Sequence, residues 1–212
     1  MTAETSQTLD RGLRLLEIIV ERPSGVSIGE LADQLGVGRT VVYRLVATLE
    51  GHALVQRDRE GHVGLGLGML TLAQAAQPLL RQIALPILRE LADGVGATAH
   101  LTRAEGDEAL AVVVVEPRWT DFHVGYREGA RHSLGRGASG RAILAGRDGS
   151  TAVVRSSGEL QVGAHGVAAP VVGVAGVEAS IGVVSLAPLG PAADAAVLGA
   201  AAKLKQAAQG TT

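Results

Sequence analysis

Four residues near position 40 carry side chains that could read the base edges of double-stranded DNA. They are Arg39, Thr40, Tyr43 and Arg44, which place two cations and two hydroxyl groups within six positions. A spacing of three or four residues brings such side chains onto one side of an α-helix. An arginine can bind guanine through two parallel hydrogen bonds, which contributes about 1–3 kcal/mol of discrimination between bases. The chemistry that this set predicts is sequence-specific contact in the major groove.

A helix from Arg39 to about Glu50 is expected to present these side chains. Its apolar residues follow helical spacing and share one side: Val42, Leu45, Val46 and Leu49. The opposite side holds Tyr43 and Arg44 together with the small Ala47. One side therefore packs, and the other is left free to bind. A three-helix packing unit with a solvated basic face is the alternative interpretation of this spacing.

Two shorter helices are expected before this one. The first ends at Pro23 and Gly25, and its apolar positions follow the spacing of one helix face: Leu9, Leu13, Leu16 and Val20. The second begins with a capping box, in which Ser27 and Glu30 each accept a hydrogen bond from the other's backbone N–H. Gly36 suits the left-handed residue that follows a helix. A short turn then leads to the third helix, which gives a helix-turn-helix.

A β-hairpin is predicted directly after the third helix. Residues 54–57 and 62–65 form its short strands, and residues 58–61 form a polar turn that ends in glycine. Arg57 and Arg59 lie on this hairpin, where their side chains can meet DNA phosphates. The order of elements is that of a winged helix-turn-helix.

The positive charge of the chain is local rather than global. The formal net charge is −2, which excludes a globally basic nucleic-acid coat protein. Residues 39–59 nevertheless hold four arginines against Glu50 and Asp58. A single chain should therefore bind DNA with modest affinity. We expect a dimer, because contacts with two half-sites raise the affinity. The chain has no cysteine, so it forms no disulfides or thiolate zinc sites.

The second half of the sequence predicts an α+β domain. Residues 68–94 have helical apolar spacing, and Pro78 and Pro86 each remove a backbone donor, so this linker is expected to be two helices or one kinked helix. Its face is too apolar for a solvated linker, which indicates a partner surface. Strands are expected at 98–102, 109–116, 121–126, 167–172 and 180–186, the last two as a hairpin, and helices at 140–145 and 192–209. Strands and helices mixed without regular βαβ spacing are typical of the α+β class.

Several segments in succession resemble the IclR family of bacterial transcriptional regulators. Residues 35–49 resemble the recognition helix of that family, and residues 8–16 resemble its first helix. Further segments resemble the family's wing exit (65–68), its effector-domain "SGKAxLA" segment (137–145) and its "GEL…G…IAAPV" stretch (157–163 and 167–171). The resemblance extends over nearly the whole chain. Arg39, Thr40 and Val41 replace residues that are usual in the family, so the operator sequence does not carry over.

The resemblance implies three parts. These are a winged helix-turn-helix DNA-binding domain (1–67), linker helices (68–94), and a GAF-like effector-binding domain with an antiparallel sheet and flanking helices (95–212). The last part is shortened after Ala145, where the family usually has further helices. The partners implied are a double-stranded operator, a small-molecule effector such as a small organic or aromatic acid, and a second copy of the chain, with dimers that pair into tetramers. No cofactor, metal or membrane contact is implied.

The same resemblance places the effector pocket in the second domain. The residues that it assigns are Ala138, Ser139, Gly140, Ser156 and Ser185. Ser185 depends on strand register, since a shift by one residue turns a side chain to the other face. The backbone N–H groups of Gly137, Ser139 and Gly140 precede a short helix and could bind a carboxylate. An ordinary glycine-rich loop is the alternative.

Other classes of function find little support in the sequence. Residues 137–140 lack the G-x-S-x-G pattern of a nucleophile elbow, and the histidines lack the two-histidine spacing of a helical metal site. Neither an enzyme nor a metal site is predicted. A GAF-like module that responds to a protein partner remains an alternative to metabolite binding. The polar, acidic start is unlike a signal peptide, and the longest uncharged runs are broken by proline and glycine, so we expect a cytoplasmic protein.

Overall fold

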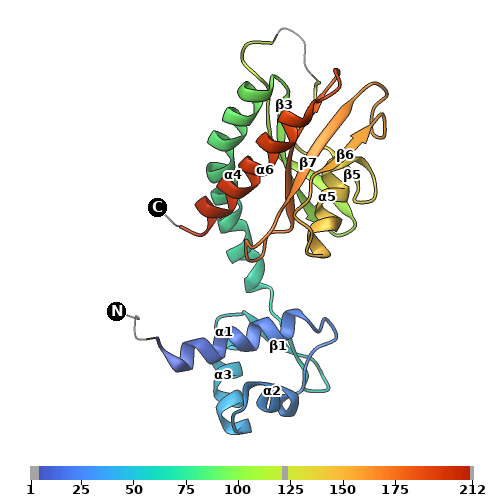
Figure 1. The fold of residues 1–212 in the computed structure, drawn as a ribbon. Helices are drawn as coiled ribbons and strands as arrows, with labels where there is room; N and C mark the ends of the chain where they lie inside the picture. Colours follow the sequence, from blue (N-terminus) through green and yellow to red (C-terminus); the bar gives the residue numbers. More distant parts are fainter. Residues whose placement is uncertain (1–4, 121–123, 211–212) are drawn as a thin grey trace. The chain divides into compact units, whose positions relative to one another are not determined.

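The computed structural model describes residues 5–120 and 124–210. The chain divides into two compact units, residues 1–77 and 78–212. The first is mostly helical, and the second is built around an antiparallel sheet (Figure 1). The predicted α+β class is confirmed.

The N-terminal unit is a winged helix-turn-helix. Its elements are α1 (Gln7–Val20), α2 (Ile28–Leu35), α3 (Arg39–Gly51), β1 (Val55–Arg57), β2 (Val63–Leu65) and the first turns of α4 (Gly68–Val95). The predicted capping box of α2 is present: Ser27 Oγ accepts the N–H of Glu30, and Glu30 Oε2 accepts the N–H of Ser27 at 2.9 Å. The hydrogen bond from the Ser27 side chain lowers the pKa of Glu30. Gly36 ends α2 with φ at 63°.

The core of this unit differs from the prediction for α1. Leu15 and Ile19 are the buried side chains of α1, and they pack with apolar side chains from α2, α3 and the hairpin. Three residues of the predicted face are exposed instead, with Leu9 at 62%, Leu13 at 52% and Val20 at 59%, whereas the fourth, Leu16, is half-buried and packs against the core. Both sets follow helical spacing, so periodicity alone could not decide which of them packs inside.

The wing is a short antiparallel hairpin, as predicted. Val55 pairs with Leu65 and Arg57 with Val63. Gly61 takes φ at 86° in the turn between them, a conformation that glycine adopts without strain. Val26 bridges to Val63, which ties the segment before α2 to the wing.

α4 is one helix from Gly68 to Val95, with Pro78 and Pro86 inside it. Of the two forms expected for the linker, two helices or one, the structure has the single helix. Both prolines are exposed, so the backbone acceptors that they leave unpaired lie on the solvent side. None of the described helices is long and apolar enough to cross a membrane.

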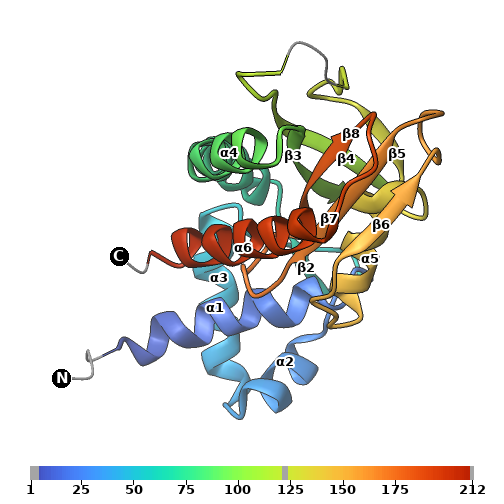
Figure 2. The same cartoon turned by 45° about the horizontal axis from the view of Figure 1, so that its top comes forward.

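The C-terminal unit packs helices on both faces of a six-stranded sheet. Besides the rest of α4 it contains β3 (Thr98–Glu105), β4 (Glu108–Val115), β5 (Arg131–Ser133), α5 (Gly137–Arg147), β6 (Val154–Ser157), β7 (His165–Val171), β8 (Ala179–Ser185) and α6 (Pro191–Ala208). The strand order is β5-β4-β3-β8-β7-β6, and every neighbouring pair is antiparallel. α4 and α6 cover one face of the sheet and α5 covers the other (Figures 1 and 2).

Alternation along β7 shows how one strand serves both layers. Val167 and Ala169 belong to the core beneath α4 and α6, whereas Ala168 packs against Ala138 and Ala142 of α5. Successive side chains of a strand point to opposite faces, so a run of small apolar residues satisfies both layers.

One strand prediction needs correction, and the short strand β5 was not predicted. Residues 124–126 are not in a strand, and residues 121–123 lie outside the described part of the chain. Besides pairing with β3, β4 pairs with β5, through Arg131–Ser133. Its three polar residues give no hydrophobic pattern, which is why the sequence did not reveal it.

Candidate functional site

The exposed side of α3 is the candidate nucleic-acid surface. Val42 and Val46 are fully buried and hold the helix against the core of the N-terminal unit. Thr40 and Arg44 are exposed on the other side, and Tyr43 is 50% exposed. The predicted division of this helix into a packed and a free side is confirmed.

Arg39 is placed by a glycine on the preceding helix. One terminal nitrogen of its guanidinium group lies 3.3 Å from the point that a Cβ on Gly29 would occupy. A larger residue at position 29 would therefore press on this side chain. Glycine at this position leaves room for Arg39 beside the first turn of α2, at the start of the free side of α3.

Arg57 joins the wing to α3. Its guanidinium carbon lies 5.6 Å from the ring centroid of Tyr43, within the range of a cation–π contact. Its Nε lies 3.2 Å from Glu50 Oε1, so part of its charge is offset. Arg44 and Arg59 form no ion pair with any residue in the described ranges. These two side chains are therefore free to meet an external anion.

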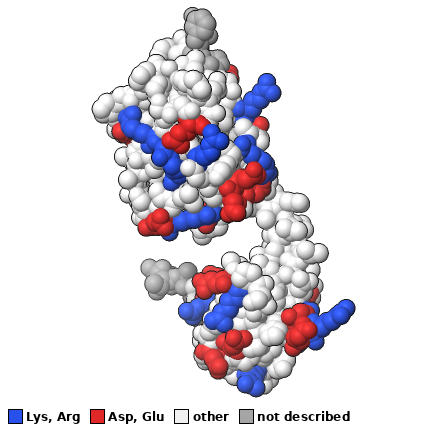
Figure 3. All heavy atoms as spheres, turned by 90° about the vertical axis from the view of Figure 1, so that its right-hand side faces the viewer, with Lys and Arg blue, Asp and Glu red and all other residues white. Residues whose placement is uncertain are grey.

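The C-terminal unit shows no comparable basic surface on the face that Figure 3 displays. Positive and negative side chains are interspersed there. Several charged side chains of the C-terminal unit are paired, for example Arg147 with Glu178 at 2.7 Å and Arg155 with Asp194 at 2.7 Å. Paired surface charges offer little net field to a polyanion. The free cations of α3 and the wing are thus the better candidates for DNA contact.

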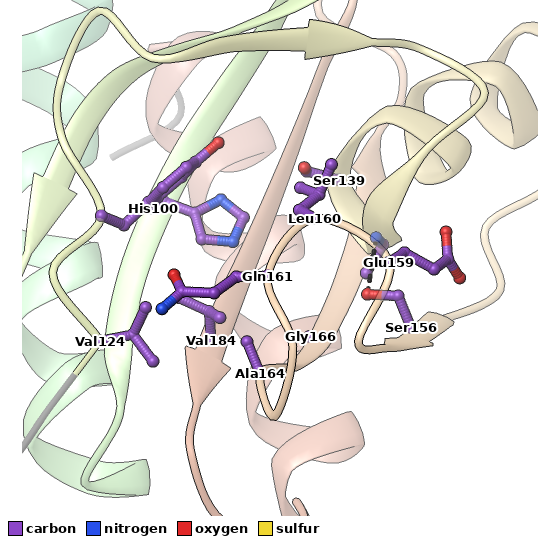
Figure 4. A pocket seen from close by; sticks show the side chains of 12 residues that line it. His100, Val124, Ser139, Ser156, Glu159, Leu160, Gln161, Ala164, Gly166 and Val184 are labelled. Atoms are coloured by element: carbon purple, nitrogen blue, oxygen red, sulfur yellow. Dashed lines mark hydrogen bonds between the residues drawn. The ribbon is translucent and has the colours of Figure 1, made fainter.

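A second candidate site is a cavity in the C-terminal unit, between the sheet, the start of α5 and the β6–β7 loop (Figure 4). Its volume is about 70 Å³. The strands contribute His100, Ser156, Gly166 and Val184; the first turn of α5 contributes Ala138 and Ser139; the loops contribute Val124, Tyr126, Glu159, Leu160, Gln161 and Ala164.

Polar side chains gather at the end of the cavity nearest β3. His100 is only 4% exposed, its Nδ1 lies 3.1 Å from Thr102 Oγ1, and its ring meets Tyr126 edge to face at 5.3 Å. Burial, helped by the charge of nearby His132, lowers the pKa of His100 to about 4, so it is neutral at pH 7. Burial likewise raises the pKa of Tyr126, although the Thr102 and Ser139 hydroxyls partly oppose this effect.

The Tyr126 hydroxyl in this cluster lacks a hydrogen-bond partner. It is buried and forms no hydrogen bond of normal geometry. Ser139 Oγ lies 3.1 Å from Nε2 of His132, and the Nδ1 of His132 lies 3.0 Å from a backbone oxygen. A buried hydroxyl without a partner is costly, and here it lines a cavity that a ligand can enter.

The opposite wall of the cavity is the N-terminus of α5. The Gly137 N–H donates to Glu159 Oε2 at 2.9 Å, and the Ala138 N–H donates to Ser156 Oγ at 3.0 Å. Arg141 forms an ion pair with Glu159 Oε1 at 2.8 Å. The predicted carboxylate site at this helix start therefore holds a carboxylate, and that carboxylate comes from the chain itself.

The structure brings some of the predicted effector residues together and separates others. Ala138, Ser139 and Ser156 line the cavity. Gly140 does not, because a Cβ there would lie 2.6 Å from the backbone oxygen of Leu134, so this glycine serves close packing.

Ser185 does not line this cavity; its neighbour on the strand does. Val184 faces the cavity, and Ser185 Oγ instead accepts the N–H of Ala187 at 3.0 Å. Adjacent residues of a strand point to opposite faces, which accounts for the difference. His100, Tyr126 and Glu159 were missed because the fold brings them to the cavity from distant parts of the sequence, His100 on a strand and the other two on loops. Glu159 lies in the "GEL" stretch, and that stretch was the only sequence signal for it.

Within the described residues, no group of three or more acidic or histidine side chains is arranged to hold a metal ion. The chemistry of both sites is hydrogen bonding and charge. On α3 and the wing it suits phosphates and base edges, and in the cavity it suits a small polar molecule.

Comparison with known proteins gives matches to one family in both halves of the chain. Residues 8–59 match the IclR helix-turn-helix domain, and residues 73–155 match the bacterial transcriptional regulator IclR C-terminal domain. The HTH-type transcriptional regulator KipR of Bacillus subtilis is 32% identical over 141 residues, which are 66% of this chain and 56% of KipR. The transcriptional repressor IclR of Escherichia coli is 27% identical over 143 residues, 66% of this chain and 52% of the repressor. The chain spans about half the length of the curated relatives that it matches.

Crystal structures of such regulators share the fold. An IclR transcriptional regulator from Alicyclobacillus acidocaldarius is 21% identical, with a TM-score of 0.55 over 95% of this chain and 98% of its own. An IclR homologue from Microbacterium hydrocarbonoxydans, crystallised with 4-hydroxybenzoate, is 18% identical, with a TM-score of 0.55 over 97% of this chain and 100% of its own.

Proposed function

Because the chain belongs to the IclR family of bacterial transcriptional regulators, we propose that it binds an operator sequence in double-stranded DNA and that a small molecule in the C-terminal domain modulates this binding. We assign DNA binding to residues 1–67, linkage to 68–94 and effector binding to 95–212. The protein acts as a regulator in the cytoplasm rather than as an enzyme.

The observation that carries the proposal is the free side of α3. Tyr43 and Arg44 are exposed, while apolar residues of the same helix are fully buried. The second helix of a helix-turn-helix enters the major groove, and its N-terminal residues meet base edges. Arg44 is the cation best placed for a bidentate contact with guanine, and Arg59 at the wing tip meets phosphate.

The exposed apolar side chains of the N-terminal unit suit a homodimer. Leu9 and Leu13 on α1, and Leu70 and Leu72 on α4, are each more than half exposed. Residues 68–80 of α4 contain no charged side chain. Apolar surface of this kind is buried favourably against a second copy, and the dimer presents two recognition helices to two half-sites. The dimers in turn pair into tetramers.

The effector that the cavity suits is a small organic acid. Its lining combines apolar side chains with the N-terminus of α5 and the neutral His100. A structural neighbour was crystallised with 4-hydroxybenzoate, which is an acid with a second polar group. A ligand here acts on the sheet against which Ala84 and Leu88 of α4 pack, and α4 runs back to the wing exit at Gly68.

The coupling between the two ligands is expected to be about 1–3 kcal/mol, and it must be reciprocal. The effector changes the affinity for the operator by the same factor by which the operator changes the affinity for the effector. The coupling free energy can have either sign: the effector either weakens or strengthens binding of the regulator to DNA.

Selection of bound fragments from the sheared genome tests the function. We expect the recovered fragments to share an inverted repeat whose half-sites lie about 10 base pairs, or a multiple of this, apart. In fluorescence anisotropy the recovered sequence should bind at least ~10³-fold more tightly than a scrambled duplex. Fragments with no common sequence, bound as tightly as the scrambled duplex, would contradict the proposal.

A further inference from the structure

The start of α5 already holds a carboxylate from another part of the chain. Glu159 accepts the Gly137 N–H and pairs with Arg141, at 2.9 and 2.8 Å. Its own backbone oxygen also accepts a hydrogen bond from Arg136. Glu159 belongs to the β6–β7 loop, so its carboxylate reaches the helix from a different part of the chain.

Glu159 also separates two hollow spaces. On one side is the cavity of about 70 Å³, and on the other is a surface cleft of about 390 Å³ lined by Arg141, Arg155 and His165. Ser156, Glu159 and Gly166 line both spaces. A cavity of about 150 Å³ is known to hold benzene, so the closed cavity takes only a molecule smaller than that ring. Withdrawal of Glu159 would open it toward the cleft.

The other end of the cavity has hydrogen-bonding groups without partners. The Tyr126 hydroxyl is buried and unsatisfied. His100 is 4% exposed and bonds only through Nδ1, to Thr102, so its Nε2 has no hydrogen-bond partner among the residues that the structure describes. Figure 4 shows the His100 ring pointing toward the loop that carries Leu160 and Gln161. These groups call for a ligand with a hydroxyl or carbonyl oxygen at its far end.

We propose that Glu159 is an internal occupant of the ligand site, which a small carboxylic acid with one further polar group must displace. The incoming carboxylate accepts the Gly137 N–H and pairs with Arg141, while its hydroxyl or oxo group meets Tyr126 and His100. The inference rests on the proposed function, because it assumes that this cavity is the effector site.

The loop that carries Glu159 buries few of its side chains. Gly158 and Gly163 flank it with φ at 69° and 79°, conformations that glycine adopts freely. Leu160 lies over Gly137, where a Cβ would come within 2.7 Å of it, and is still 44% exposed. Loss of the Glu159 contacts therefore leaves the loop held by little buried surface.

Glycolate, which carries a carboxylate and a hydroxyl, and its neutral amide glycolamide are the probes. Calorimetric titration at constant ionic strength compares the wild-type chain with Glu159→Gln. The glutamine keeps the shape but loses the charge, and charge-assisted hydrogen bonds are roughly twice as strong as neutral ones. We expect Glu159→Gln to bind glycolate about tenfold more tightly than the wild type does, and both proteins to bind glycolate more tightly than glycolamide, because only glycolate can pair with Arg141. Glu178→Gln, which removes a carboxylate paired with Arg147 outside the cavity, is the matched control and should match the wild type.

Equal or weaker glycolate binding by Glu159→Gln overturns the proposal, as does equal preference for glycolate and glycolamide, or no binding of glycolate by either protein. Hydrogen exchange in the wild-type chain gives a test that does not depend on the variant. Glycolate should speed exchange in residues 158–164, and unchanged or slower exchange there refutes the displacement. Operator binding is measured on the same preparations without probe. If the wild type still prefers the operator to a scrambled duplex but the glycolate result fails, only this inference is rejected. If the wild type shows no such preference, the proposed function is rejected.

Discussion

His100 should make the stability of the C-terminal unit fall steeply in mild acid. The ring is 4% exposed, contacts Tyr126 at 5.3 Å between centroids, and lies near His132. Burial, followed by the charge of His132, lowers its pKa from 6.5 to about 4. Protonation of His100 in the folded chain would place a charge on a ring that is almost fully buried.

The sign and size of the effect follow from proton linkage. Between pH 6.5 and pH 4 the unfolded chain holds a proton on His100 and the folded chain does not, so acid favours unfolding. At the limit of low pH, a shift of about 2.5 units corresponds to about 3 kcal/mol. Between pH 7 and pH 5 the loss is about 2 kcal/mol, and the local slope near pH 5 is about 1 kcal/mol per pH unit.

Urea unfolding followed by the fluorescence of Trp119 measures this loss. Trp119 is the single tryptophan of the chain and belongs to the C-terminal unit, where its Nε1 donates to the backbone oxygen of Asp93. The pKa of Asp93 is lowered chiefly by its hydrogen bonds from Arg118, so its stabilisation is lost only as the pH falls well below this window. We expect His100→Gln to lose about 2 kcal/mol less than the wild type between pH 7 and pH 5. The same slope in both proteins would refute the buried, neutral assignment of this histidine.

Three further predictions concern capping, packing and charge. Ser27→Ala removes the side-chain cap of α2 and should lower the stability of this helix by about 1 kcal/mol. Faster hydrogen exchange in residues 28–35 measures the loss. Ser24→Ala, at an exposed turn, is the control and should leave this exchange unchanged. Gly140→Ala places a Cβ 2.6 Å from a backbone oxygen and should destabilise the C-terminal unit by roughly 1–3 kcal/mol. A Cβ on Gly199, in α6, would meet nothing within 4 Å, so Gly199→Ala should stabilise the C-terminal unit by up to about 1 kcal/mol. Urea unfolding followed by Trp119 fluorescence measures both variants. Equal effects of the two substitutions would contradict the packing argument. Arg57→Gln should weaken binding to all duplexes alike and lower the salt dependence by about one phosphate contact, whereas loss on the operator alone would mean that Arg57 reads a base.

The N-terminal unit was the more predictable half, for a physical reason. The Ser27–Glu30 cap, the left-handed Gly36 and the spacing of α3 all depend on residues a few positions apart, so sequence alone defines them. The exposed Leu9 and Leu13 mark the limit of that reasoning. Helical spacing identifies an apolar face but does not say whether the chain's own core or another surface covers it.

The cavity was predicted only in part because its walls depend on distant pairings. His100 faces Gly182 across β3 and β8, and Ser156 faces Gly166 across β6 and β7. One residue of register decides whether Val184 or Ser185 points inward. Glu159 reaches the start of α5 from a loop, and no local pattern reports such a contact. The first turn of α5 was found because its glycine-rich start is a local signal.

The most direct test of the account replaces Arg44 with alanine. Fluorescence anisotropy compares Arg44→Ala with Arg147→Ala, an exposed arginine of the C-terminal unit, on the selected operator and on a scrambled duplex. We predict that Arg44→Ala loses about tenfold or more on the operator, as expected for a base contact, and little on the scrambled duplex, while Arg147→Ala matches the wild type on both. Equal losses on the two duplexes, or none on either, would contradict the claim that the free side of α3 reads DNA sequence.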